Sequence, residues 1–154
     1  MNDLGFSLIQ AVGSLATPVA VFLAWRELRR ADKQALTDFE DGFSREYRQL
    51  SQALPVKALL GEPLVDKEAE DAKPSFFRYF DLCNEQVFLR QNKRISKETW
   101  LSWCSGIESN LKLSAFNSAW NSINSRTQSF AELKRLEASG FSDDPVSWGR
   151  GHLE

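Results

Sequence analysis

The sequence predicts an all-α protein, with one N-terminal transmembrane helix followed by a cytoplasmic bundle of about five helices. Three observations lead to this prediction. Residues 4–25 contain no ionisable side chain. From residue 26 onward, apolar residues recur at spacings of three and four, as they do on the packed face of a helix. No segment shows the apolar–polar alternation that is typical of a strand.

The first segment, residues 1–25, is predicted to cross a membrane. As a helix, Leu4 to Trp25 would extend about 33 Å, and a bilayer's hydrocarbon core measures about 30 Å. A helix buried in a soluble protein is the alternative, because Gly13 and Pro18 are poor helix formers in water. A cleaved signal peptide fits less well, since the basic residues follow the apolar run instead of preceding it.

The charges beside this segment predict its orientation. Lys and Arg stay on the cytoplasmic side, so we expect the N-terminus outside the membrane and residues 26–154 in the cytoplasm. An indole at the boundary is favourably half-wet, and basic side chains contact anionic lipid headgroups. The residues in these roles are Trp25, Arg26, Arg29, Arg30 and Lys33.

Polar residues in the predicted span fall on one stripe. Ser7, Gln10, Ser14 and Thr17 follow a regular spacing of three and four residues. An amide at membrane depth needs a hydrogen-bonding neighbour, and a single-span chain must find it in another copy. We therefore expect a homo-oligomer. Two uses of the stripe stay open: an interface between identical helices, or the lining of a pore.

The amino-acid composition argues against several classes of partner and ligand. The 154 residues include 19 Lys and Arg against 21 Asp and Glu, for a net charge of −2. This balance gives no basic field and argues against a nucleic-acid partner. Cys83 and Cys104 are expected to be reduced core residues, and with His152 as the single histidine no metal site is expected. No cofactor is expected either.

The chain after the span is predicted as a helix, a connector and a domain. Residues 26–54 form a helix with one apolar stripe, packed on its own domain or, alternatively, in a coiled coil with other copies. Residues 55–73 form a connector, and its charged part, Asp66 to Lys73, is expected to be solvated or mobile. Pro55 marks the boundary between the two.

Residues 74–140 are predicted as the helical domain, with residues 141–154 a loose tail from which Phe141 or Trp148 docks back. Pro74 should occupy the first turn of a helix through Gln91. The later helix boundaries are predicted from capping residues: Ser96 and Ser114 as N-caps, Ser129 with Glu132 as a capping box, and Gly140 as a stop.

One polar patch lies on the Pro74–Gln91 helix. Arg78, Asp81, Asn84 and Glu85 are three or four residues apart and therefore neighbours. They form either an ion-pair network that ties the helix to its surroundings or a small recognition or acid–base site. The sequence contains no phosphate loop, nucleophile elbow or dinucleotide turn, so no catalytic residues are assigned and an enzyme is not the expectation.

The segments FFRYFDLCNEQVFLR, RISKETWLSW and AFNSAW, placed behind an apolar and then a basic helix, resemble uncharacterised bacterial single-pass proteins with a small cytoplasmic helical domain. The layout is also similar to that of small membrane effectors of antiphage systems, including those that accompany RNA-guided nucleases. This resemblance implies a self-assembling effector or pore in the bacterial inner membrane, acting in bacterial stress or antiphage defence. The alternative is a membrane-tethered adaptor that binds a cytoplasmic protein partner without pore activity.

Overall fold

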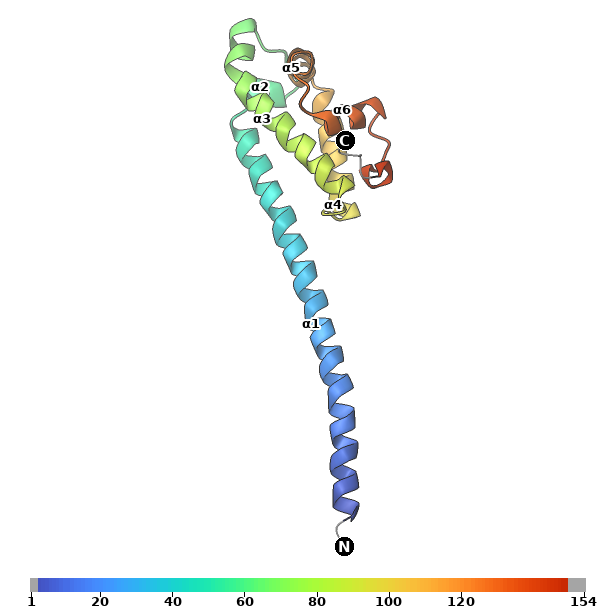
Figure 1. Cartoon of the computed structure of the whole chain (residues 1–154). Helices are drawn as coiled ribbons and strands as arrows, with labels where there is room; N and C mark the ends of the chain where they lie inside the picture. Colours follow the sequence, from blue (N-terminus) through green and yellow to red (C-terminus); the bar gives the residue numbers. More distant parts are fainter. Residues whose placement is uncertain (1–2, 150–154) are drawn as a thin grey trace. The chain divides into compact units, whose positions relative to one another are not determined.

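The computed structural model describes the backbone of residues 3–149 and the side chains of residues 20–149. All of the regular secondary structure in this part is helical (Figure 1). Its elements are α1 (Asp3–Gln52), α2 (Val56–Leu59), α3 (Asp66–Gln91), α4 (Lys97–Leu111), α5 (Ser114–Asn124), α6 (Ala131–Ala138) and the 3₁₀ helix η1 (Pro145–Trp148). No strand occurs between residues 3 and 149, so the predicted all-α class is confirmed.

The chain divides into two compact units, Met1–Phe39 and Glu40–Glu154. The backbone of α1 is helical on both sides of this division, so it contributes residues to both units. The second unit contains the C-terminal part of α1 and every later element. We refer to it below as the helical domain.

The described residues include no helix that combines the length and apolarity needed to cross a bilayer. Most of the predicted span, residues 4–19, has side chains outside the described part. The transmembrane helix therefore stays a prediction.

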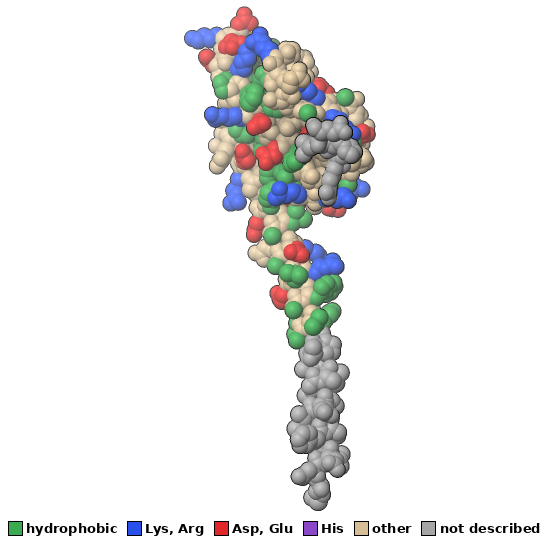
Figure 2. Space-filling view, viewed as in Figure 1, with side chains coloured by type: hydrophobic (Ala, Val, Ile, Leu, Met, Phe, Trp, Pro, Cys, Tyr) green, Lys and Arg blue, Asp and Glu red, His purple; other side chains and the backbone are tan. Residues whose placement is uncertain are grey.

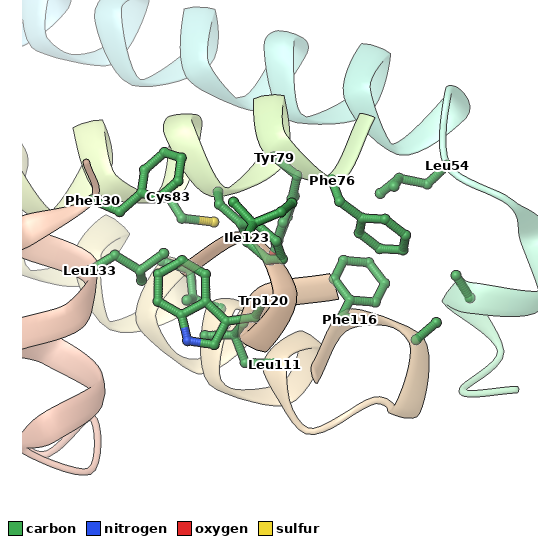
Figure 3. Close-up of a cluster of buried hydrophobic side chains, with 14 of the residues drawn as sticks. Leu54, Phe76, Tyr79, Cys83, Leu111, Phe116, Trp120, Ile123, Phe130 and Leu133 are labelled. Atoms are coloured by element: carbon green, nitrogen blue, oxygen red, sulfur yellow. The ribbon is translucent and has the colours of Figure 1, made fainter. Parts of the chain in front are cut away.

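The core of the helical domain forms where α3 packs against α5 and α6 (Figure 3). Its centre is aromatic. Phe76 meets Phe116 edge to face with ring centroids 5.1 Å apart, and Phe80 meets Trp120 in the same way at 5.0 Å. Edge-to-face pairs add stabilisation beyond the burial of their area. All four of these side chains are at most 1% exposed.

The start of α3 corrects one prediction. Asp66 to Lys73 is mostly solvent-exposed, as predicted, but it is not part of a connector: it forms the first turns of α3, and Pro74 lies inside the helix instead of in its first turn. Acidic residues near a helix N-terminus are stabilised by the helix dipole. Glu68 also accepts hydrogen bonds from the Val65 amide and from the Lys57 ammonium, and Ala72 is buried in the core. These contacts explain why a charged run is ordered.

The helix caps agree with the sequence in part. Ser96 accepts a hydrogen bond from the Thr99 amide, as predicted for the N-cap of α4. Gly140 follows the end of α6 with φ of 65°, a conformation that favours glycine, and the predicted stop is confirmed. Ser114 is not an N-cap, because α5 begins at that residue and Leu113 holds the cap position.

The N-terminus of α6 is capped from another helix. The predicted capping box of Ser129 and Glu132 is wrong, since Phe130 holds the cap position in a left-handed conformation. The Asn84 side-chain oxygen on α3 accepts hydrogen bonds from the Glu132 and Leu133 amides, at 3.0 and 3.1 Å. A side-chain oxygen at this position satisfies amides that the helix itself leaves unpaired.

The tail is ordered through Gly149, which also differs from the prediction. Asp144 forms a two-point ion pair with Arg90, at 2.8 Å to Nε and 2.6 Å to Nη2, and Pro145 is buried. The Arg135 guanidinium lies 4.5 Å from the centre of the Trp148 ring. Trp148 therefore does contact the domain, while residues 150–154 of the predicted tail lie outside the described part.

Candidate functional site

The predicted membrane-proximal residues are all solvent-exposed: Trp25, Arg26, Arg29, Arg30 and Lys33. The Arg29 guanidinium stacks on the Trp25 ring at 4.8 Å, and Arg30 pairs with Glu27 at 3.2 Å. The four residues of the predicted polar stripe, Ser7, Gln10, Ser14 and Thr17, have side chains outside the described part.

Large apolar side chains lie exposed next to this basic segment. Val21 is 64% exposed, Phe22 57% and Trp25 52%, and Leu23 and Leu28 are exposed to a similar degree. Scattered exposed apolar residues are ordinary, but a run of them within two helical turns marks a surface suited to another apolar phase or partner.

The polar patch on α3 separates into unrelated roles. Arg78, Asp81 and Glu85 are exposed, and no ion pair joins them among the residues that the structure describes, so the expected network does not form. Asn84 is the member with a structural role, because it caps α6. Their arrangement provides neither a shared acid–base pair nor a metal site, and residues 20–149 contain no cluster of His, Cys, Asp or Glu suited to a metal ion.

The structure reveals a different candidate site, a cavity of about 320 Å³ within the helical domain. This volume lies at the lower end of the range of small-molecule pockets, about 300–1,000 Å³. The cavity lies among the C-terminal part of α1, the middle of α3 and α4. The residues that line it are Ser44, Tyr47, Arg48, Tyr79, Cys83, Gln86, Ser102, Trp103, Gly106 and Ile107.

Gln86 is the unusual member of this lining. It is 4% exposed, yet its side-chain amide makes no hydrogen bond to any described residue. Every fully buried side-chain nitrogen or oxygen between residues 20 and 149 has a hydrogen-bond partner. The amide of Gln86 therefore has to retain access through the cavity that it lines. A buried amide without a protein partner costs free energy, about 1–3 kcal/mol, unless something else pairs with it.

The wall beside Gln86 is aromatic and uncharged. The Tyr47 and Tyr79 rings are 6.3 Å apart, and the Asn110 amide donates to the Tyr79 hydroxyl at 2.9 Å. Burial raises the pKa of Tyr79 well above its usual value. Burial also raises the pKa of Cys83 to about 12, an effect that a hydrogen bond with Tyr79 opposes only in part. Both groups are therefore neutral at physiological pH.

Arg48 is the one charged residue among the cavity lining. It is exposed, and its Nε donates to the Ser44 carbonyl oxygen at 3.1 Å along α1. No carboxylate lines the cavity. The interior is thus neutral and largely apolar, with one amide able to both donate and accept.

Sequence reasoning did not identify Gln86 or the cavity. Gln86 follows Glu85 on an ordinary amphipathic helix, and three segments far apart in the sequence enclose the space beside it. Both cysteines were predicted as reduced core residues, and the structure confirms this, since Cys83 and Cys104 are free and buried.

The outer surface gives no indication of a nucleic-acid interface on the face drawn in Figure 2. Basic and acidic side chains both occur over the described part of that face. Comparison with protein families, with curated protein sequences and with solved structures finds no match to this chain.

Proposed function

We propose that this chain is a membrane-anchored helical protein that self-assembles through its N-terminal segment and holds the helical domain in the cytoplasm. The observation that carries the proposal is the uncharged sequence of residues 4–25. The exposed apolar residues Val21, Phe22 and Leu23 and the exposed basic residues after Trp25 support it. An apolar run followed by a Trp and several Arg is the pattern of a membrane helix that ends at the cytoplasmic interface.

Anchoring is tested by fractionating bacteria that express the full chain and washing the membranes with alkaline carbonate. The wild type should stay in the membrane pellet. Leu15→Asp places a charge in the middle of the run, which costs about 2.5–3.5 kcal/mol for insertion, and should move the chain to the soluble fraction. Ala31→Asp, the same charge at an exposed position of α1 beyond the apolar run, is the matched control and should leave the chain in the pellet. A wild type recovered in the soluble fraction would contradict the proposal.

Self-assembly is carried by the polar stripe of the sequence. Inside lipid, a Gln side chain lowers its free energy by hydrogen-bonding across a helix interface. We expect the full chain in mild detergent to be oligomeric and Gln10→Leu to shift it toward the monomer. Val12→Leu lies on the opposite stripe and should leave the molecular mass unchanged. A membrane-bound monomer would contradict self-assembly and favour the adaptor alternative.

A pore is the second candidate function, and the same stripe favours it. If Ser7, Gln10, Ser14 and Thr17 line a lumen, vesicles containing the purified chain should leak ions, and Gln10→Leu should suppress the leak. Expression in bacteria should then depolarise the inner membrane. If the chain is oligomeric but causes no ion leak from vesicles, the stripe forms the interface between helices and no pore.

A further inference from the structure

We propose that the cavity among α1, α3 and α4 is a binding site for a small, uncharged, planar molecule that carries adjacent hydrogen-bond donor and acceptor groups, the chemistry of a nucleobase or a lactam. This inference is independent of membrane anchoring and assembly. It assigns the helical domain a ligand that the proposed function does not require.

The first step of the argument is the unpaired amide. Gln86 is 96% buried (4% exposed), lines the cavity and has no hydrogen-bond partner among the described residues. Its amide presents one carbonyl acceptor and an NH₂ donor side by side. The complementary ligand is a group with a donor and an acceptor in the same arrangement, which an amide edge of a ring provides.

The second step is the shape and character of the walls. Tyr47, Tyr79 and Trp103 contribute aromatic rings to the lining, and Ile107 adds an aliphatic side chain. Aromatic walls favour flat molecules, which stack on or pack edge-on against the rings. A cavity of about 320 Å³ accommodates a ring system of this kind.

The third step is charge. None of the described residues that line the cavity carries a carboxylate, so a cationic ligand would have no counter-charge. The single charged residue in that described lining is Arg48, which is exposed, so its charge is hydrated by solvent and is not a buried counter-charge for an anion beside Gln86. Burying an unpaired charge beside neutral Tyr79 and Cys83 is costly. The ligand is therefore uncharged where it contacts Gln86.

The test uses the full chain, purified in mild detergent, and isothermal titration with small probes. Uracil and nicotinamide are the neutral, planar, amide-bearing probes. Benzylamine is the cationic probe, with an ammonium group on a neutral ring, and benzene is the probe without an amide. We expect one saturable site for uracil or nicotinamide, with a dissociation constant of about 1 mM or lower, and at least tenfold weaker binding of the other two.

Gln86→Leu tests the role of the amide. This substitution should raise the dissociation constant of the amide-bearing probe at least tenfold, while the chain still unfolds in one cooperative transition. Gln52→Leu, which removes an exposed Gln at the end of α1, is the matched control and should bind like the wild type. No saturable binding of either amide-bearing probe, or equal binding by the wild type and a folded Gln86→Leu variant, would overturn the proposal. Equal affinity for benzene and uracil would also overturn it, because the cavity would then select for apolarity alone.

Discussion

Two faces of α3 differ in how closely they pack against the neighbouring helices. The face toward α5 and α6 is closed: Phe76 and Phe80 are almost completely buried, and the Asn84 side-chain oxygen accepts hydrogen bonds from two backbone amides of α6. The face toward α4 and the C-terminal part of α1 leaves a cavity beside Gln86, whose amide is unpaired. The same helix therefore borders a closely packed core on one face and a cavity on the other.

The comparison shows which polar side chains on α3 contribute to stability. Asn84 and Arg90 each have partners in the protein, so removing them breaks existing hydrogen bonds. Gln86 has none, so its presence is not explained by folding. Substitutions along α3 sharpen this contrast.

The largest effect is expected on the closed face. Phe80→Ala removes a side chain that is fully buried against Trp120, so it should lower the free energy of unfolding by about 3–5 kcal/mol. Chemical denaturation of the full chain measures it. Phe88→Ala, an exposed Phe on the same helix, is the control and should change stability by about 0.5 kcal/mol or less. Similar losses for both variants would show that the aromatic core is not as closely packed as described.

The next effect concerns the ion pair between Arg90 and Asp144. Hydrogen bonds from Arg90 hold the pKa of Asp144 below its usual value. Asp144→Asn should therefore cost about 1.5 kcal/mol near neutral pH, a modest value because the carboxylate is partly exposed. A depressed carboxyl pKa contributes stability above its unfolded value, and this contribution is lost as the pH falls through the folded value.

Denaturation curves recorded from pH 7 down to pH 3 check this sign. The wild type should lose more stability on acidification than Asp144→Asn, so that the two curves converge in acid. Glu40 also makes stability fall on acidification, and it does so equally in the wild type and in Asp144→Asn. Burial raises the pKa of Glu40, but hydrogen bonds from Thr99 and Ser96 outweigh this effect and lower it. Parallel curves would mean that the Asp144 carboxylate gains nothing from Arg90.

A smaller effect is expected for the cap of α6. Asn84→Leu leaves the Glu132 and Leu133 amides without their acceptor and should cost about 1 kcal/mol. Hydrogen exchange should quicken at these two amides first. Asn84→Asp keeps an acceptor and adds a favourable charge near the helix N-terminus, so it should retain most of the stability. Unchanged exchange in Asn84→Leu would show that α6 does not depend on this cap.

The smallest effect is expected at Gln86. Because the Gln86 amide has no protein hydrogen bond to lose, and water in the ligand-free cavity can pair with it, Gln86→Leu should change the unfolding free energy of the ligand-free chain by only about 0.5 kcal/mol, in either direction. Thermal denaturation beside Asn84→Leu makes the comparison direct. A loss as large as that of Asn84→Leu would give Gln86 a structural role and weaken the contrast between the two faces.

Much of the helical domain could be predicted from local sequence. The apolar spacing on α3 identifies Phe76 and Phe80 as core residues, Ser96 identifies the start of α4, and Gly140 the end of α6. These features depend on residues within one or two turns of each other, so periodicity and capping rules are sufficient to find them.

The remaining features depend on distant partners. Asn84 caps a helix 48 residues away in the sequence, and the Arg90–Asp144 pair joins residues that are 54 apart. Neither residue carries a local signal for its partner. The cavity is harder still, because it requires the relative positions of three helices. Ser7, Gln10, Ser14 and Thr17 remain a prediction from spacing alone.

The burial of Cys83 makes the rate of its alkylation a measure of how often the helical domain opens. Thiolates, not thiols, react with alkylating reagents, and the raised pKa of Cys83, about 12, leaves almost none of that form at neutral pH. Cys83 is also only 1% exposed, so modification should be slow in the native fold and faster when the surrounding helices separate. The rate at which Cys83 is alkylated therefore reports on the transient opening of the native domain.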